Sequence, residues 1–192
     1  MGVRIDVVDN GGQWTHREWR MMKELEAGTN IIPNTTPVEK IEADGLILSG
    51  GAPRIGSEIP KLGVTEDYLD RLNIPILGIC VSHQFIALHF GGKAGPAKVP
   101  EYGKAELIVT EPDDLFEGLP ERFTVWESHN DEIYELPDVF LALAHSKDCR
   151  FEAIKHKSRP LYGVQFHPEV EHTSHHYEIF ANFIDVVARN TP

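Results

Sequence analysis

The feature that most constrains the fold is a series of short apolar runs in the first half of the chain, separated by loops and helix-length segments. The runs lie at residues 3–10, 29–34, 45–51 and 74–80, and the segment 14–27 has the apolar spacing of a helix. Such unbroken apolar runs are typical of strands buried on both faces. Their alternation with helices predicts a parallel sheet covered on both faces, with ligands gathering at the carboxyl ends of the strands.

The second half is richer in expected strands, and we expect residues 1–192 to form a single domain. No linker, repeat or low-complexity segment divides the chain, and 41% hydrophobic with 25% charged residues is the composition of a globular domain with a sizeable core. The prediction is an α/β fold with an open, mostly parallel sheet. Extended segments are expected at 105–110, 123–128, 140–145, 151–156 and 161–167, and a closing helix at 175–188.

Charge and cysteine usage limit the partners and the compartment. The 18 basic and 30 acidic residues leave a net charge of −12, which disfavours binding to nucleic acid or to an anionic membrane. Cys80 and Cys149 are too few for a disulfide framework, and the chain begins with nothing like a signal peptide. No apolar run approaches the roughly 20 residues of a membrane-spanning helix. We therefore expect a cytoplasmic protein that acts on small molecules or protein partners.

Cys80 ends one of the apolar runs, in the stretch ILGICVSHQ, and a helix-like segment beginning near His83 follows it. A strand, a tight turn that carries the nucleophile, and a helix form the arrangement called a nucleophile elbow. The positive end of the helix favours the reactive thiolate. On this segment alone, a buried and inert cysteine is an equally good interpretation. Cys149, in SKDCRFEAI, has no such turn and is expected to be structural.

The segment LYGVQFHPEV supplies candidates for a general base and for its orienting group. An apolar run ends at His167, Pro168 prevents the strand from continuing, and Glu169 follows two positions after the histidine. His167 would take the proton of the thiol, and Glu169 would hold the imidazole in the correct tautomer. A surface His-Pro-Glu turn is the alternative, and it is weakened by the elbow at Cys80.

These segments together resemble the class I glutamine amidotransferases, which release ammonia from glutamine for a partner synthase. The resemblance covers nearly the whole chain and rests on the stretches GICVSHQ, LILSGGAP, WESHND and GVQFHPEVEHT. With the opening DNGGQWTHR, the chain is most similar to the separate glutaminase subunit of two-subunit GMP synthetases. The resemblance implies a flavodoxin-like α/β fold and a partner chain that carries the ATP-pyrophosphatase activity.

The family pattern implies roles for eight residues of this chain. By this resemblance Cys80, His167 and Glu169 match the catalytic triad, and the backbone N–H groups of Gly51 and Val81 match the oxyanion hole, where they would face charge that develops in the transition state. The residues that match the binding site for the α-amino and α-carboxyl groups of glutamine are Gln84, His129 and Asp131. A polar residue at a helix start and an acidic loop at 130–132 are the plainer interpretations of these last positions.

Two departures from the family pattern concern the turns around the nucleophile. The elbow usually has glycine two positions after the cysteine, whereas this chain has Ser82, whose side chain is expected to crowd the turn. Replacing Ser82 by glycine is therefore expected to improve the alignment of the oxyanion hole. The loop Gly50-Gly51-Ala52-Pro53 also has one residue between its glycines and its proline, which is unusual for the family.

Two other motifs are not interpreted as binding sites. The stretch DNGGQ lacks the third glycine of a dinucleotide fingerprint and the lysine of a P-loop, so a backbone turn or a partner-facing loop is expected there. His172, His175 and His176 lie close together without cysteines or carboxylates at metal-binding spacing. We therefore expect no dedicated metal site.

The function expected from the sequence is hydrolysis of L-glutamine to glutamate and ammonia through a thioester on Cys80. The ammonia would pass to a separate synthetase subunit that converts XMP to GMP with ATP and magnesium, so no cofactor is expected on this chain. Alternatives are the glutaminase of an anthranilate or carbamoyl-phosphate system, a stand-alone γ-glutamyl hydrolase, and a regulatory module that no longer catalyses.

Overall fold

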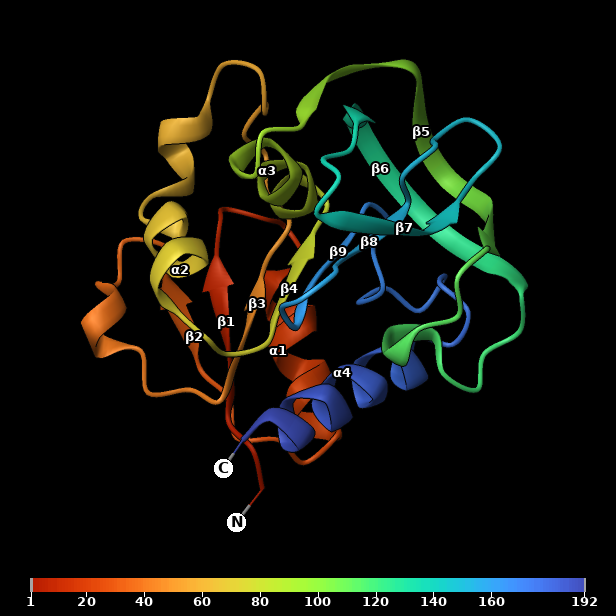
Figure 1. The fold of residues 1–192 in the computed structure, drawn as a ribbon. Helices are drawn as coiled ribbons and strands as arrows, with labels where there is room; N and C mark the ends of the chain where they lie inside the picture. Colours follow the sequence, from red (N-terminus) through yellow and green to blue (C-terminus); the bar gives the residue numbers. More distant parts are fainter. Residues whose placement is uncertain (1, 192) are drawn as a thin grey trace.

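The computed structural model describes residues 2–191 and has an α/β architecture (Figure 1). In this part of the chain nine strands form one sheet, in the order β2-β1-β3-β4-β9-β8-β7-β5-β6. The strands are β1 (Ile5–Asp9), β2 (Ile31–Pro33), β3 (Gly45–Leu48), β4 (Ile76–Ile79), β5 (Lys93–Val109), β6 (Arg122–Glu135), β7 (Phe140–His145), β8 (Ala153–His156) and β9 (Leu161–Val164). The α-helices are α1 (Thr15–Glu24), α2 (Thr65–Arg71), α3 (Val81–His89) and α4 (His176–Asn190).

One half of the sheet is parallel and contains the apolar runs of the first half of the chain. Strands β2, β1, β3, β4 and β9 pair in parallel, and the interior positions of β3, β4 and β9 are buried on both faces. The predicted α/β fold is confirmed. The strands are shorter than the apolar runs, because the last residues of each run turn into the loops at the carboxyl edge.

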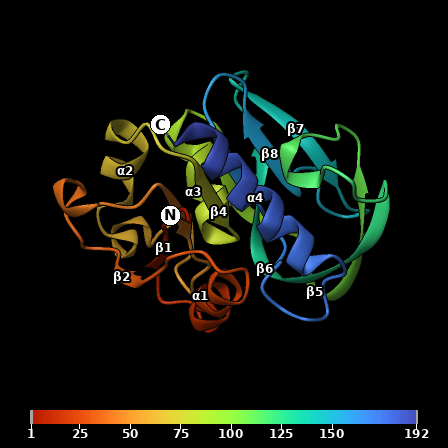
Figure 2. The same ribbon diagram turned by 90° about the horizontal axis from the view of Figure 1, so that it is seen from below.

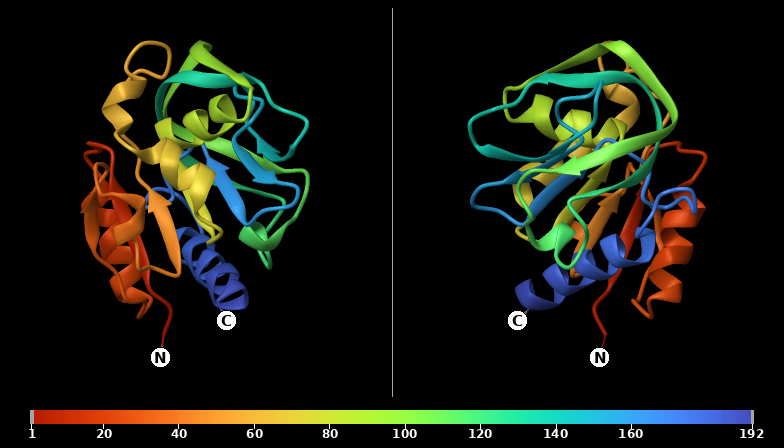
Figure 3. Two further views of the ribbon diagram at one scale, coloured as in Figure 1. Left: turned by 60° about the vertical axis from the view of Figure 1, so that its left-hand side comes forward. Right: turned by 90° about the vertical axis from the view of Figure 1, so that its right-hand side faces the viewer.

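The other half of the sheet is antiparallel, so the complete sheet is mixed. Strands β9, β8, β7, β5 and β6 pair antiparallel in that order, and β5 and β6 are long partners. They extend well beyond the segments 105–110 and 123–128 that the sequence indicated. Figure 3 shows these strands, green to cyan, curling around the yellow-green helix α3, which contacts both β5 and β6.

Helices cover both faces of the parallel half and define two cores. Helices α1 and α4 lie on one face, where Met22 and Phe183 are buried against the sheet (Figure 2). Helices α2 and α3 lie on the other face and bury Tyr68 and Ile86. No helix among residues 2–191 combines the length and the apolar character needed to cross a membrane.

The loops that follow β1, β3, β4 and β9 meet at the carboxyl edge of the parallel half. This arrangement follows from the topology, since parallel strands end at the same side of a sheet. It brings Gly12, Gly51, Cys80 and His167 to one place, although they come from segments far apart in the sequence.

Candidate active site

Cys80 occupies the strand-to-helix turn between β4 and α3 with a strained backbone. Its φ is 52° and its ψ is −109°, a conformation that costs free energy for any residue with a Cβ. The turn is held on both sides: the Cys80 N–H donates to the Val164 carbonyl at 2.8 Å, and the Gln84 N–H donates to the Cys80 carbonyl at 3.1 Å. The turn therefore places the thiol at the N-terminus of α3, facing the cavity at the carboxyl edge.

Two glycines allow helix α3 to approach the sheet closely beneath this turn. A Cβ at Gly78 would lie 2.6 Å from Ile86 Cδ1 and 3.0 Å from the Ser82 carbonyl carbon. A Cβ at Gly163 would lie 2.6 Å from His83 Nδ1. Both separations are below van der Waals contact, so the close packing depends on glycine in the strands β4 and β9 and not on glycine at position 82.

Ser82 fits the elbow, contrary to the crowding expected from the sequence. Its side chain is fully buried, and its hydroxyl donates to the Ser49 carbonyl at 2.7 Å. The same hydroxyl accepts a hydrogen bond of 2.9 Å from Asn10 Nδ2. The serine thus joins the ends of β1, β3 and β4 through satisfied hydrogen bonds, so we no longer expect glycine at this position to improve the site.

His167 and Glu169 form a buried pair next to the thiol. The distance from His167 Nδ1 to Glu169 Oε1 is 2.7 Å. Gly50 lies between the imidazole and Cys80, and a Cβ at Gly50 would contact both His167 and the Cys80 Cβ. Burial acts to lower the pKa of His167, but the charges of Glu169 and Cys80 outweigh it and raise that pKa well above its usual value. The arrangement therefore stabilises a protonated imidazole next to the thiol.

The backbone and the ring of His167 are also held by groups that the sequence did not single out. The Thr173 hydroxyl donates to the His167 carbonyl at 2.7 Å, and the His167 N–H donates to the Trp126 carbonyl at 2.9 Å. The ring of Trp14 lies edge-on to the imidazole, with 4.5 Å between ring centroids. Trp14 belongs to the DNGGQWTHR stretch, so that loop forms a wall of the site.

The thiol has two polar neighbours besides the histidine. Gln165 is fully buried, and its Nε2 donates toward Cys80 Sγ at 3.7 Å, where it stabilises negative charge on sulfur. The Ser128 carbonyl oxygen lies 4.0 Å from Sγ on the other side. Gln165 lies directly after β9 and two positions before His167, but a buried glutamine there gives no sequence signal for this contact.

The proposed oxyanion donors both line the same cavity as the thiol. Within residues 2–191, neither the Gly51 N–H nor the Val81 N–H donates a hydrogen bond to another protein group. A Cβ at Gly51 would lie 2.3 Å from the Asn10 carbonyl oxygen, so this position requires glycine. A Cβ at Gly12 would similarly lie 2.4 Å from the Gly50 carbonyl oxygen. The two glycine loops are therefore packed directly against each other.

The three predicted substrate-binding residues lie together, and each already has hydrogen-bond partners in the protein. Gln84 Nε2 donates to the Asp131 carbonyl at 2.6 Å, and His129 Nδ1 donates to the same oxygen at 3.0 Å. The Asp131 carboxylate accepts two hydrogen bonds from Arg54, at 2.9 and 2.7 Å. His129 and Asp131 belong to strand β6 and are buried, so they do not form the acidic loop considered above.

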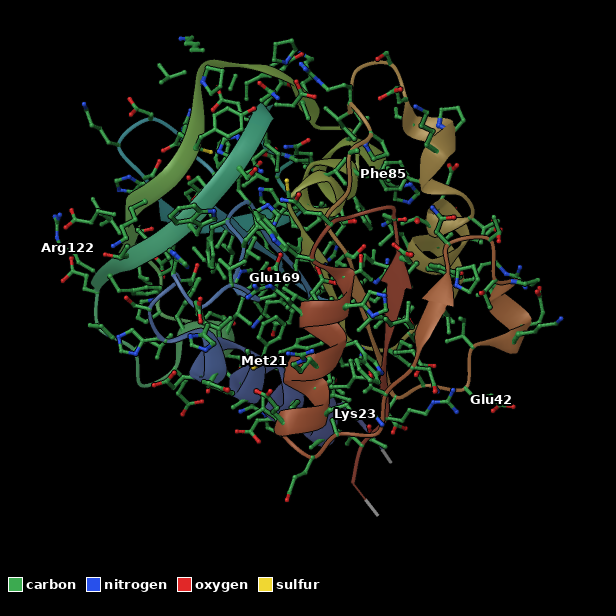
Figure 4. All side chains as sticks on the ribbon, turned by 180° about the vertical axis from the view of Figure 1, so that it is seen from behind. Met21, Lys23, Glu42, Phe85, Arg122 and Glu169 are labelled. Carbon is green, nitrogen blue, oxygen red and sulfur yellow. The ribbon has the colours of Figure 1, made fainter. Side chains whose placement is uncertain are left out.

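Glu18 of α1 is a buried acid that the sequence did not indicate. It is 1% exposed, lines the cavity, and has an Oε2 atom without a partner in residues 2–191. Burial, and then the charge of Glu169, raise the pKa of Glu18 well above its usual value. Figure 4 shows Glu169 close to the start of α1, between this helix and the long antiparallel strands. Glu18 thus places a buried carboxyl group behind the His167–Glu169 pair.

Together these residues surround a cavity of about 300 Å³, the size of a site for a small molecule. The eight residues named from the sequence all contribute to its wall. The cavity combines a thiol on a strained backbone turn, a histidine paired with a carboxylate, and two backbone N–H groups that do not donate to the protein within residues 2–191. Such a set can attack an acyl carbon and stabilise the oxyanion that results.

Comparison with known proteins places this chemistry in a family. The family model described as glutamine amidotransferase class-I matches residues 6–187. The chain belongs to this family. It is 54% identical over 187 residues to a glutamine-hydrolyzing GMP synthase subunit of Thermoplasma acidophilum, and the match covers 97% of this chain and 94% of the relative. The protein of the same name from Thermococcus kodakarensis is 50% identical over 185 residues, covering 95% and 97% of the two chains.

Solved structures of similar proteins share the fold of this glutamine amidotransferase. A crystal structure from Thermoplasma acidophilum, described as a candidate GMP synthase subunit, has a TM-score of 0.94 and 53% identity, with 98% and 96% of the chains covered. A glutamine amidotransferase from Thermotoga maritima has a TM-score of 0.75 at 20% identity, covering 98% and 84%. The second likeness shows that the fold persists where most of the sequence differs.

Proposed function

We propose that this amidotransferase hydrolyses L-glutamine to glutamate and ammonia and supplies the ammonia to a separate synthetase subunit that converts XMP to GMP. The observation that carries the proposal is the meeting of a strained Cys80 with the His167–Glu169 pair in one cavity. The relatives named as glutamine-hydrolyzing subunits of GMP synthase support the choice of product. No feature of residues 2–191 favours an anthranilate or carbamoyl-phosphate system.

The acylation step uses the groups at the elbow. His167 takes the thiol proton, and Cys80 Sγ attacks the carboxamide carbon of glutamine. The carbonyl oxygen gains negative charge, which the N–H groups of Gly51 and Val81 stabilise. His167 then returns the proton to the nitrogen, the C–N bond breaks, and ammonia leaves a γ-glutamyl thioester on Cys80.

The deacylation step repeats the same chemistry with water. His167 takes a proton from water, and the resulting hydroxide attacks the thioester carbon. The C–S bond breaks, glutamate is released and the proton returns to sulfur. In both steps Glu169 holds the imidazole through Nδ1 and stabilises its positive charge, as its 2.7 Å contact allows.

The pair of Arg54 and Asp131 matches the two charged groups of an amino acid. Asp131 is buried, whereas the Arg54 side chain is 48% exposed. In the substrate complex we propose that Asp131 accepts hydrogen bonds from the α-ammonium and that Arg54 binds the α-carboxylate. Gln84 and His129 hold the Asp131 carbonyl and so keep this part of β6 in place.

ATP and magnesium would then act on the partner synthetase, and this chain would need no cofactor for glutamine hydrolysis. Both cysteines are free, as a reducing compartment requires, and the proposed location is the cytoplasm. A free glutaminase would release ammonia to water, so we propose that the isolated chain is nearly silent. Misplacing the base by about 1 Å can cost roughly a hundredfold in rate, so small shifts on docking suffice for control.

The test is to titrate the purified synthetase, with ATP and XMP, into the isolated chain and to follow glutamate release and GMP formation. We expect glutamate release to rise with synthetase until the two chains are equimolar. Glutaminase activity that is maximal alone would contradict the coupling and leave the hydrolysis standing. Absence of glutamate release under every condition would contradict the enzymatic function and favour a regulatory module.

A further inference from the structure

A second cluster of chemically active side chains lies in the antiparallel half. It contains Glu101 of β5, His129 of β6, and Cys149 and Glu152 of the segment between β7 and β8. All four residues contribute buried groups, and one ligand atom from each lies within 4.8 Å of those from the others. Glu127 of β6 adds a third carboxylate, since its Oε2 lies 3.5 Å from His129 Nε2.

Several polar atoms of this cluster are buried without a partner. In residues 2–191, this holds for both carboxylate oxygens of Glu127, both of Glu152, and His129 Nε2. Glu127 is 1% exposed and Glu152 is fully buried. A buried carboxyl group without a hydrogen-bond partner costs free energy, which a retained proton or a positive group offsets. Lys and Arg supply none here, because no ion pair joins either type to these carboxylates in the described chain.

The hydrogen bonding of His129 shows what its second nitrogen faces. Nδ1 lies 3.0 Å from the Asp131 carbonyl oxygen, which only accepts, so Nδ1 carries a proton. Nε2 lies between two carboxylates, with Glu101 Oε2 at 3.4 Å and Glu127 Oε2 at 3.5 Å. A metal ion placed among these three groups would accept a lone pair from each of them. A backbone carbonyl on the far nitrogen is also what usually orients a histidine that binds a metal.

We propose that Glu101, His129, Cys149 and Glu152 form a binding site for a divalent transition metal of the zinc class, with Glu127 as a neighbouring acceptor. The donor set of one nitrogen, one sulfur and two oxygens suits Zn²⁺, whereas Mg²⁺ and Ca²⁺ prefer oxygen alone. Ligand atoms on a tetrahedral Zn²⁺ lie about 3.3–3.8 Å apart, given bonds of about 2.0–2.3 Å. The side chains therefore need to contract only slightly around the ion.

The surroundings provide both rigidity and access. Ser146 holds the cluster in place, because its hydroxyl donates to Glu101 Oε1 at 3.0 Å and accepts from the Cys149 N–H at 2.9 Å. Glu101 and Glu127 also line a surface cavity of about 470 Å³ that opens beside Lys147, which gives a metal ion a route from solvent. A bound ion would join β5, β6 and the segment between β7 and β8, and would hold the strand that carries Ser128 against the active site.

This site replaces the expectation from the sequence that the chain has no dedicated metal site. None of its ligands comes from the triad, although His129 also lines the active-site cavity. It also differs from the histidine stretch at 172–176, which was the metal candidate considered from the sequence.

The experiment uses the full chain stripped of metal and then given one equivalent of Zn²⁺ or Co²⁺. We expect about one metal ion per chain by elemental analysis, a rise in Tm with Zn²⁺, and a thiolate-to-cobalt absorption band with Co²⁺. Cys149→Ser should abolish the band and the rise in Tm. Glu152→Gln should weaken Zn²⁺ binding at least about tenfold while keeping the cobalt band at saturating metal.

Three controls exclude other sources of metal. Cys80→Ser should keep the band, whereas a metal held by the catalytic thiol would be lost in that variant. His175→Ala with His176→Ala should keep one metal ion per chain. Glu171→Gln, an exposed carboxylate beside that histidine stretch, should bind Zn²⁺ like the parent chain. Circular dichroism of each variant checks that the fold is retained.

Failure of the parent chain to bind either metal would overturn the proposal. A cobalt band that survives Cys149→Ser and disappears in Cys80→Ser would overturn it as well. Because these measurements do not use glutamine, neither outcome bears on the proposed hydrolysis.

Discussion

The two cysteines of this protein have neighbours of the same residue types but lie in different regions of the fold. Cys80 has a histidine and a glutamate nearby, His167 and Glu169, and Cys149 lies within reach of His129 and Glu152. Cys80 also has the N-terminus of α3, a strained turn and a cavity. Cys149 has no helix behind it and is surrounded by carboxylates. The comparison teaches that the same residue types become a nucleophile or a ligand according to the backbone that carries them.

The charged groups around the two cysteines also act differently. The charge of Glu169 raises the pKa of the His167 imidazole despite its burial, which favours the protonated imidazole. Burial, followed by the charge of Glu152, raises the pKa of the Cys149 thiol, so without a cation Cys149 stays protonated and inert. Only a bound metal would turn this thiol into a thiolate.

The largest expected effect comes from replacing each of the two cysteines in turn by alanine. Cys80→Ala should reduce glutamate release at least about 10⁴-fold, since loss of a nucleophile removes the covalent route. It should also abolish labelling by a glutamine-like electrophile, detected by mass spectrometry. Cys149→Ala should keep labelling at Cys80. Labelling that moves to Cys149, or that survives Cys80→Ala, would remove the distinction between the two regions.

A smaller effect is expected at the boundary between the regions, where Arg54 reaches Asp131 of β6. Arg54→Ala should lower kcat/KM for glutamine by roughly 10–100-fold, mostly through KM, because hydrogen bonds to charged groups contribute about 1.5–3 kcal/mol. Steady-state kinetics over a range of glutamine concentrations measures the split. Arg71→Ala removes another exposed arginine, which pairs with Glu39, and should leave KM unchanged. An unaltered KM in Arg54→Ala would show that Arg54 does not bind substrate.

The next prediction concerns the pH dependence of stability caused by Glu18. Its pKa is raised in the folded state, so between the unfolded pKa of about 4.3 and the folded pKa the folded chain holds a proton that the unfolded chain has lost. The stabilisation is complete at acid pH and is lost as pH rises through that window. Glu18→Gln, which cannot ionise, should therefore gain Tm relative to the parent chain as pH rises.

The measurement is thermal unfolding of both chains at pH 5 and pH 8. We expect Glu18→Gln to gain several degrees more at pH 8, since about 1 kcal/mol shifts Tm by roughly 2–4 °C in a chain of this size. Glu24→Gln changes an exposed acid on the same helix and should show no such trend. A pH-independent difference for Glu18→Gln would mean that Glu18 ionises normally.

The smallest effect is expected at Ser82. Its hydroxyl bridges Ser49 and Asn10, so Ser82→Gly should lower the free energy of unfolding by about 1–2 kcal/mol without raising kcat. Ser82→Ala separates loss of the hydroxyl from the added freedom of glycine. Urea unfolding and glutaminase kinetics measure the two quantities. A higher kcat in Ser82→Gly would restore the view that serine strains the elbow.

The parallel half could be predicted well because its information is local. Each of its strands is a continuous apolar run, and Cys80 with His167 and Glu169 lie at the ends of two such runs, which parallel pairing brings to one edge. The antiparallel half was predicted less completely. β5 extends from Lys93 through Gly95 and Pro96, residues that discourage a strand in isolation, and its pairing with β6 is what makes it extended.

The sequence by itself determined the fold class, the elbow and the identity of the candidate triad, because strand periodicity and turn chemistry act over a few neighbouring residues. Only the tertiary structure decided which side chains meet across long separations. It brought Arg54 to Asp131, Gln165 to the sulfur of Cys80, and Glu18 behind Glu169. It also joined Glu101, His129, Cys149 and Glu152 from three separate segments. The spacing of residues in the chain does not predict such contacts, because strand order and sheet curvature arise only when the whole core packs.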